Sequence, residues 1–299
     1  MRTNQRAPAG SAPTVAHVAG TERFVLSDVE FDVAWQELVG EGGRPMPPAL
    51  GVPSAGRTHA QRRELEAAAR RSLAARFPPA AGAGLVRLLA LLAFPAQQLE
   101  LRGRELRAVA ACGGGAGALA IRRSGSVCLS GCDSAPVGLL GALPAAGPGP
   151  GRSCSLPTSA LAAALGAPAL LPALLARLPA GQARVLARLL DGAEQQVQIV
   201  AQRCDSRGEL HRAGGVVGIL DGPTGRYQLT RSQAADGTEW TTIAPAGPRG
   251  LLHRVAELLD PEQPDAGRSS MPGAIGATPA TTGRSGPARP PPRPRPRPR

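Results

Sequence analysis

The sequence predicts an α+β protein with a central, mostly antiparallel sheet. Two well-capped helices come first, and alternation of apolar and polar residues typical of strands begins only after them. Two blocks then follow one plan, in which helices lead into a strand that opens with Gln-Gln, at Gln97–Leu101 and again 98 residues later (195 − 97) at Gln195–Ile199. We therefore expect two structurally similar halves that meet on one sheet.

The first predicted helix follows a short strand at Phe24–Leu26. Ser27 and Glu30 have the spacing of a capping box, in which each side chain accepts a hydrogen bond from the other residue's backbone N–H. Leu26 and Phe31 have the spacing of a hydrophobic staple across this cap. We interpret the apolar stripe of the helix as core packing rather than as a ligand site: Phe31, Ala34, Trp35 and Leu38.

A second helix follows the Pro- and Gly-rich loop Gly40–Gly56. Thr58 and Gln61 predict another capping box, and Pro78 and Pro79 end the helix. One face is expected to be buried, comprising Leu65, Ala68, Ala69, Ser72 and Leu73. The charged residues of this helix are expected to form a solvated face: Arg62, Arg63, Glu66, Arg70 and Arg71.

Shorter elements are predicted for the rest of the first half. Leu85–Phe94 is a short apolar helix, and alternation around Leu99 and Leu101 predicts a strand. Gly-rich turns separate three further strands, at Leu106–Cys112, Leu119–Ile121 and Val127–Leu129. Pro136–Pro157 is predicted to be irregular.

The second half returns to helices and then to strands. Helices are predicted at Thr158–Gly166, Ala169–Leu178 and Gln182–Asp191. Strands are predicted at Val197–Ala201, at Leu210–Leu220 as one long strand or a pair, and in a hairpin of Tyr227–Arg231 with Glu239–Ile243. A last helix starts near Pro248, with a buried face of Leu251, Leu252, Val255, Leu258 and Leu259.

Arginine supplies every basic charge of this chain apart from histidine. The 299 residues include 34 Lys or Arg, and none of them is lysine. Walker-type phosphate loops, Schiff-base enzymes and conventional protein kinases each need a lysine, so these classes are excluded. Only 2% of residues are aromatic against 42% hydrophobic, so alanine, leucine and valine must fill the core.

Much of the positive charge lies in the C-terminal tail. Net charge is +12, and the residues after Asp265 hold seven arginines and no acid, which leaves +5 for the rest (12 − 7). This Pro- and Arg-rich tail cannot bury a core, so 261–299 is expected to be disordered with polyproline II character. Residues 1–20 are expected to be a disordered leader, because they lack the continuous apolar segment of a signal peptide. The folded domain is therefore expected at 21–260.

Two interpretations of the tail stay open. A solubilising or incidental extension is favoured. The alternative is that the arginines bind nucleic acid or another anionic surface, or that the prolines dock in an aromatic groove.

The uncharged stretch Ala160–Ala176 is near the lower length limit for a membrane span. Gly166, Pro168 and Pro172 interrupt it, so two short buried helices are favoured and no membrane insertion is expected. Five cysteines, an odd number without C-x-x-C spacing, favour a reduced cytoplasmic protein with buried thiols. The closest pair, Cys128 and Cys132, is not predicted to be a site.

No residue pattern predicts catalysis, a metal or a cofactor. Ala111–Ala120 contains a G-x-G-x-x-A match, but no helix and no correctly spaced acid follow it, so a β-turn is favoured over a dinucleotide site. The four histidines are scattered singly: His17, His59, His211 and His253. We expect no enzyme activity, no catalytic, cofactor-binding or metal-binding residues and no small-molecule substrate. The chain is expected to act through a binding surface.

Three segments resemble the EspG family, the secretion-associated proteins of the ESX (type VII) systems of actinobacteria. Phe24–Trp35 resembles the opening of that family. Val52–Arg62 is similar to its V-P-S-x-G-R-T-H loop, and Gly225–Arg231, followed by Trp240–Pro245, is similar to its C-terminal G-R-Y-x-L-T-R hairpin. The resemblance covers about Arg23 to Asp260 in the same order.

This resemblance implies a cytoplasmic, substrate-specific chaperone of type VII secretion. Such a protein would bind the helical tip of a PE/PPE-like heterodimer, cover its apolar residues and keep it soluble for export, without a cofactor. It also implies a central antiparallel sheet flanked by helical bundles in quasi-twofold halves. No contact residues are assigned by the resemblance. We expect the partner surface on the sheet and the later helices, with no nucleic acid as partner in this interpretation.

Overall fold

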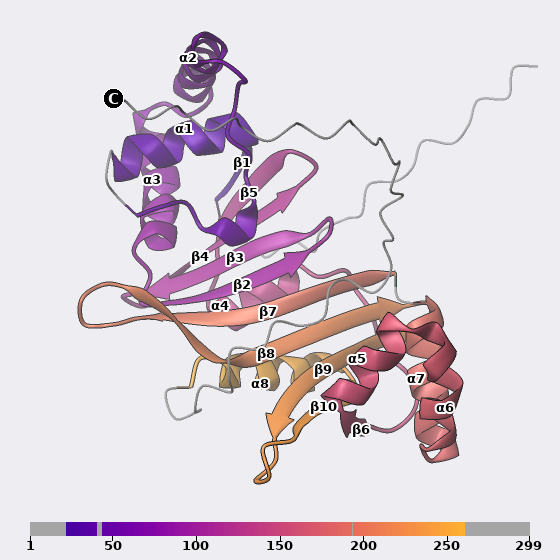
Figure 1. Cartoon of the computed structure of the whole chain (residues 1–299). Helices are drawn as coiled ribbons and strands as arrows, with labels where there is room; N and C mark the ends of the chain where they lie inside the picture. The colour runs from indigo at the N-terminus through magenta and orange to yellow at the C-terminus, as the bar shows by residue number, and fades with distance from the viewer. Residues whose placement is uncertain (1–21, 41–43, 193, 261–299) are drawn as a thin grey trace, which may run out of the picture.

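The computed structural model describes residues 22–40, 44–192 and 194–260 (Figure 1). The expected disordered leader at 1–20 and tail at 261–299 therefore lie outside the described residues. The first half contains β1 (Arg23–Ser27), α1 (Asp28–Val39), the 3₁₀ turn η1 (Pro48–Leu50), α2 (His59–Arg76), α3 (Pro79–Ala93), β2 (Gln97–Gly103), β3 (Arg107–Gly113), β4 (Ala116–Arg123), β5 (Ser126–Gly131) and α4 (Ala135–Gly141).

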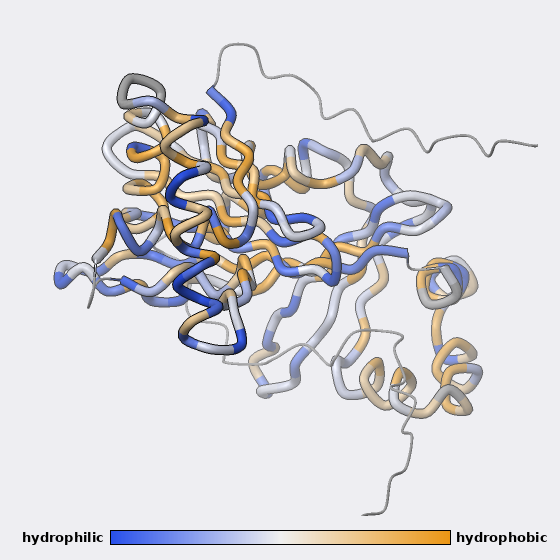
Figure 2. The backbone as a smooth tube through the Cα atoms, turned by 90° about the horizontal axis from the view of Figure 1, so that it is seen from above, coloured by the Kyte–Doolittle hydropathy of each residue, from blue (hydrophilic) through white to orange (hydrophobic). Residues whose placement is uncertain are grey.

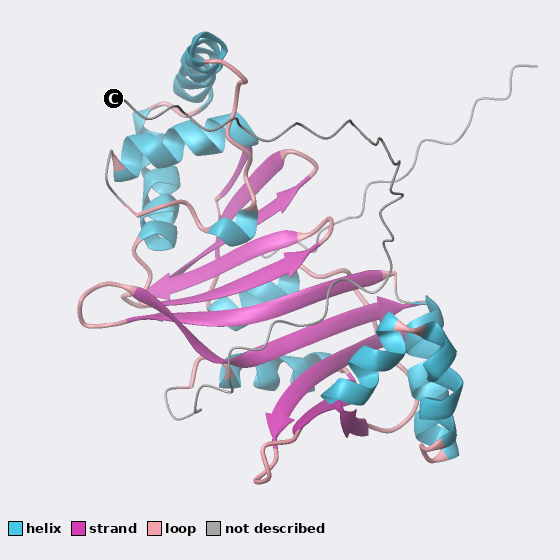
Figure 3. Cartoon of the chain, viewed as in Figure 1, coloured by secondary structure: helices cyan, strands magenta, loops and turns pink. Residues whose placement is uncertain are grey.

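The second half repeats this series of elements. It contains β6 (Cys154–Pro157), α5 (Thr158–Gly166), η2 (Pro168–Leu170), α6 (Leu171–Ala176), α7 (Ala180–Gly192), β7 (Gln195–Cys204), β8 (Leu210–Gly222), β9 (Gly225–Gln233), β10 (Glu239–Pro245) and α8 (Pro248–Glu257). Each half thus has one strand, a group of helices, four strands in series and a closing helix. Figure 3 shows the strands side by side in one sheet, with helices at both ends.

All ten strands of the described chain form one antiparallel sheet. Their order is β1-β5-β4-β3-β2-β7-β8-β9-β10-β6, so the second half of the order repeats the first in reverse. The two strands that open with Gln-Gln, β2 and β7, are the central pair, with Leu101 opposite Ile199. The predicted α+β class, the antiparallel sheet with flanking helices and the two similar halves are confirmed.

Helices cover the sheet in three groups, each with its own apolar cluster. α1 and α3 pack on β3, β4 and β5. α5 and α7 pack on β6, β8 and β10 at the other end of the same face. The opposite face carries α4 and α8, which lie behind the central strands in Figure 1. Aliphatic side chains dominate all three clusters, and alanine is common in the two clusters under α1–α3 and under α4 and α8, as the low aromatic content predicts.

The predicted capping box of α1 is confirmed. The Ser27 N–H donates to the Glu30 carboxylate at 2.8 Å, and the Glu30 N–H donates to Ser27 Oγ at 3.2 Å. Phe31 and Trp35 are both buried, with ring centroids 6.0 Å apart. Their assignment to core packing is therefore correct.

Two expectations for α2 are wrong. Thr58 Oγ1 accepts from the Gln61 N–H as predicted, but the Gln61 side chain accepts from the Arg57 N–H and not from Thr58. Only half of the capping box forms. Leu65 is 37% exposed, and Ala69 is the one buried residue of α2, which the structure describes throughout. The reason is that α2 packs on α1 largely through ion pairs.

The prediction that Pro136–Pro157 is irregular is wrong for two parts of it, because the segment contains all but the first residue of α4 and the edge strand β6. Ser134 caps α4 by accepting from the Val137 N–H, and β6 pairs with β10. These elements are short, so the sequence carries little periodic signal for them.

The stretch Ala160–Ala176 is broken into α5 and α6, as its glycine and prolines predict. No residue of α6 is buried, although a buried helix was expected; all six of its residues are described. Among the described helices, none combines the length and the apolar character that crossing a membrane requires.

Candidate partner-binding surface

The sheet has one face whose centre no helix covers. α1–α3 and α5–α7 lie at the two ends of this face, and in Figure 1 the viewer looks between them onto β7 and β8. On β7, Val197, Ile199 and Ala201 point to the opposite face and join the cluster under α4 and α8. The residues between them must therefore point to the uncovered face, because side chains alternate along a strand.

These residues form a surface that we call the central strip, and they are all partly exposed: Gln196, Gln198, Val200 and Gln202 of β7 with Val216 of β8. Val200 lies directly opposite Val216, so both point the same way. The strip therefore combines amide groups with a small apolar pair and carries no charge. Such a surface can take up a partner's backbone and apolar side chains without burying an unpaired charge.

The equivalent part of the first half is covered by the chain itself. Gln98 and Glu100 of β2 correspond to Gln196 and Gln198 by the 98-residue offset, but they are 1% and 0% exposed. η1 packs on β2, β3 and β4, in the middle of the connection between α1 and α2. In the second half, only Ala167 separates α5 from η2. No equivalent connection of the described chain crosses the central strip.

The helical segment α5–α6, at the second-half end of this face, is unusually apolar. No charged residue occurs from Thr158 to Ala176, and Leu170 between α5 and α6 is 50% exposed. In the first half, the corresponding helix α2 is strongly charged. Figure 2 shows this contrast, with orange dominating α5–α7 at the right and blue prominent in α2 at the left. Exposed apolar surface next to an uncovered sheet face is typical of a protein-binding site.

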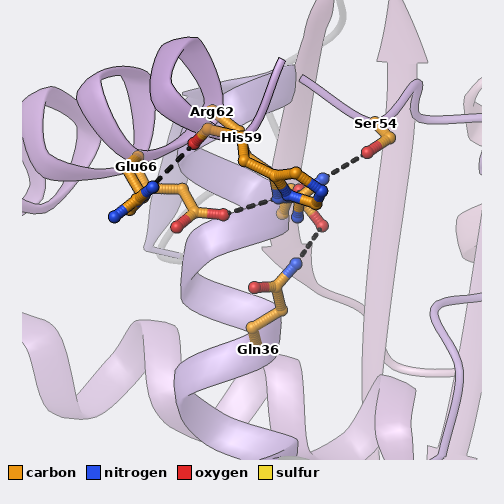
Figure 4. Close-up of polar contacts among 7 residues, drawn as sticks. Gln36, Ser54, His59, Arg62 and Glu66 are labelled. Carbon is orange, nitrogen blue, oxygen red and sulfur yellow. Dashed lines mark hydrogen bonds and ion pairs between the residues drawn. The ribbon is translucent and has the colours of Figure 1, made fainter. Parts of the chain in front are cut away.

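Ion pairs attach α2 to α1. Arg62 contacts Asp32 at 3.2 Å and Glu66 at 2.7 Å, and it also donates to Ser54 in the preceding loop (Figure 4). Further along, Arg70 contacts Glu37 at 2.8 Å. The prediction that Arg62 and Arg70 belong only to a solvated face is therefore wrong, because both arginines hold the two helices together.

Glu30 has the most buried carboxylate of this helix pair. Burial alone would raise its pKa, but hydrogen bonds from Ser72, the Ser27 backbone and Arg76 outweigh burial, so the pKa of Glu30 is lowered. The Arg76 guanidinium lies 2.8 Å from the carboxylate. This arrangement ties the end of α2 to the start of α1.

The C-terminal motif also has a structural role. Arg226 is 7% exposed and binds the Asp221 carboxylate through two hydrogen bonds of 2.6 and 2.7 Å. The Tyr227 hydroxyl donates to the Pro150 carbonyl at 2.9 Å. These contacts fix the β8–β9 hairpin against the segment that leads to β6. The motif residues therefore build the scaffold rather than the partner surface.

The other sequence motifs form no site among the described residues. Gly114 and Gly115, with φ of +59° and +80°, form the tight β3–β4 turn, which confirms the turn over the dinucleotide fingerprint. His211 contacts Asp205 and His253 contacts Glu257 singly. Within residues 22–40, 44–192 and 194–260, no group of three or more His, Cys, Asp or Glu residues could hold a metal ion.

The described cysteines are free thiols. Burial, with the nearby Cys112 and Asp133, raises the pKa of Cys132 to about 11. Burial likewise raises the pKa of Cys112 and of Cys154. A thiol is nucleophilic only as the thiolate, so these three groups are poor nucleophiles near neutral pH.

Taken together, the paired halves and the uncovered strip define a binding scaffold of α+β class. A model of the EspG family matches residues 27–257, and the chain belongs to this family. No curated protein matches the chain.

One similar solved structure is that of the Mycobacterium tuberculosis type VII secretion system chaperone EspG5 in complex with PE25-PPE41 dimer. The TM-score is 0.59 at 17% sequence identity, and the match covers 80% of this chain and 96% of that chain. At this identity, the likeness concerns the fold.

Proposed function

We propose that this EspG-family chain is a chaperone of type VII secretion that binds the helical tip of a PE/PPE-like export substrate and keeps it soluble. The observation that carries the proposal is the family match across residues 27–257. The similar fold of EspG5, solved in complex with PE25-PPE41 dimer, supports it. The chain would act in the cytoplasm, by binding and not by catalysis, and its folded domain would comprise residues 21–260.

We assign the partner contact to the central strip and the neighbouring α5–α6 helices. An export substrate that assembles through helices exposes apolar residues at its tip, and the uncharged α5–α6 helices offer a surface that can cover them. The glutamines of the strip can pair with backbone groups at the ends of the partner's helices, where four N–H or four C=O groups lack intrahelical partners. Neither contact needs a cofactor.

Co-expression tests the proposed function. The chain is produced together with a PE–PPE-type heterodimer, and the soluble fraction is analysed by size-exclusion chromatography. We expect a stable complex and more soluble heterodimer than in its absence. If no heterodimer co-elutes or gains solubility, the proposal is wrong.

A matched pair of variants tests the location of the contact. Leu170 and Val86 are 50% and 51% exposed, but Leu170 adjoins α6 whereas Val86 lies on α3 in the other half. Leu170→Asp should weaken binding by about 10-fold or more, as expected when a charge enters an apolar interface. Val86→Asp should leave binding unchanged. Equal effects of the two variants would contradict this location.

Deletion of residues 266–299 distinguishes the chaperone function from the alternative, in which the arginine-rich tail is the binding site. If the arginines bind nucleic acid or another anionic surface, binding to that surface depends strongly on salt and is lost with the tail. Heterodimer binding should survive the deletion. Loss of all heterodimer binding would favour the alternative.

A further inference from the structure

Three arginines lie directly opposite one another on neighbouring strands. Arg102 of β2 is paired with Arg107 of β3, which is paired with Arg122 of β4. We call these three residues the arginine row. Like charges placed opposite each other in a sheet are destabilising. Carboxylates beside the row would offset this repulsion. An arginine of the row that has no carboxylate partner is therefore a candidate site for a carboxylate of another molecule.

Two of the arginines have a carboxylate of their own. Arg122 binds Asp28 at the start of α1 through two hydrogen bonds of 2.8 and 2.7 Å. Arg102 contacts the fully buried Glu100 at 2.6 Å, and the other oxygen of that carboxylate accepts from Gln98. Arg102 remains half exposed.

Arg107 has no carboxylate partner among the described residues. Its Nη1 donates a hydrogen bond to the Ala49 carbonyl at 3.3 Å. The guanidinium also lies against Gly51, where a Cβ atom would come within 2.7 Å of Nη1. Contacts with η1 thus hold the side chain in place without neutralising it, and it is only partly buried. A cation that is fixed in advance loses little conformational entropy when it binds an anion.

The arginine row adjoins the central strip. Arg102 is paired with Gln198, which belongs to the strip. A partner that covers the strip therefore reaches Arg102 at the border between the two halves, and Arg107 lies one strand further on, opposite Arg102. The uncharged strip thus leads directly to the cationic row.

We propose that Arg102 and Arg107 form a subsite for a carboxylate side chain of the export substrate. This inference rests on the proposed function and adds a chemical requirement, since the substrate tip must carry an Asp or Glu beside its apolar residues. Asp28 on Arg122 shows how a helix-borne carboxylate fits this row, with one oxygen on Nε and the other on Nη2.

Charge reversal with a matched control tests the subsite. Arg63 on α2 also donates to a backbone carbonyl at 3.3 Å, that of His59, and is exposed. Arg107→Glu should weaken binding of the co-eluting PE–PPE-type heterodimer by about 10-fold or more and reduce its salt dependence. The Arg63→Glu variant should bind the heterodimer within about twofold of the original chain, because Arg63 is exposed on α2, outside the proposed contact. Titration calorimetry at low and high salt measures both.

A neutral variant tests whether weaker binding could result from misfolding. Arg107→Gln keeps a donor for the Ala49 carbonyl, and its circular dichroism and melting temperature should match those of the original chain. It should still bind the heterodimer more weakly. If Arg107→Glu and Arg107→Gln bind as well as Arg63→Glu, the subsite is wrong although the chaperone function stands. If the original chain binds no heterodimer, the proposed function itself fails and the subsite with it.

Discussion

Leu101 and Ile199 face each other across the centre of the sheet, and they are equivalent residues of the two halves. They are 98 residues apart, which is the spacing of the two Gln-Gln openings. Both side chains are fully buried in the cluster beneath α4 and α8. This pair therefore lies at the junction of the two halves, within the β2–β7 ladder.

Truncating this pair should weaken the whole fold. Leu101→Ala removes buried methyl groups from the junction, so we expect a loss of about 2–5 kcal/mol in the free energy of unfolding. The exchange of Leu101→Ile with Ile199→Leu conserves volume and should cost less than about 1.5 kcal/mol. Urea unfolding followed by circular dichroism measures both. A double exchange as harmful as the truncation would contradict this account.

Glu30 should stabilise the protein in a pH-dependent way. Its pKa is lowered in the folded state, so its stabilisation is present above the unfolded pKa and is lost as pH falls through the folded pKa. Glu30→Gln should cost about 1–2 kcal/mol at pH 7. The difference between the two proteins should shrink below about pH 4, near the ordinary pKa of glutamate. The exposed Glu64→Gln is the control, and a pH-independent difference for Glu30 would refute the assignment.

Gly51 should resist substitution because of its backbone conformation. Its φ is +58°, and an added Cβ would displace the Arg107 guanidinium. Gly51→Ala should destabilise the protein by about 1–2 kcal/mol. Gly250 lies exposed in α8 with open space around its Cα, so Gly250→Ala should stabilise by about 0.5–1 kcal/mol. Melting temperatures that shift in the same direction would show that the contrast is wrong.

Cys132 should react slowly with alkylating reagents. With a pKa of about 11, only about a thousandth of this thiol is ionised at pH 8. Mass spectrometry after a timed iodoacetamide treatment should find Cys132 almost unmodified in the folded protein. All five cysteines should be modified in urea. Rapid modification of Cys132 under native conditions would contradict its burial.

Local signals explain what the sequence could predict. The Ser27 cap, the strand alternation at Leu99 and Leu101 and the hairpin around Asp236-Gly237 depend on neighbours along the chain, and the structure contains each of them. The partner surface depends instead on strand register. Arg102, Arg107 and Arg122 have no regular spacing in the sequence. They become neighbours only when β2, β3 and β4 pair in this register.

The sequence pattern also could not predict which parts of the sheet and helices are covered by segments distant in the chain. Gln98 and Gln196 belong to the same motif, yet η1 lies over one half and nothing in the described chain takes its place over the other. Leu65 likewise occupies an apolar position on α2 and is left exposed, because ion pairs decide how that helix packs. In both cases the deciding neighbour lies in another element.

The ladder between β2 and β7 also determines how many surfaces the molecule offers. Exchanging the halves maps the pair Leu99–Ala201 onto the pair Gly103–Val197, so the ladder has the symmetry of a closed twofold dimer, with both halves in one chain. A true homodimer would present two identical surfaces. Here the two halves differ, because η1 covers β2, β3 and β4 and no described segment covers β7 in the same way. Because both halves belong to one chain, their pairing does not depend on protein concentration.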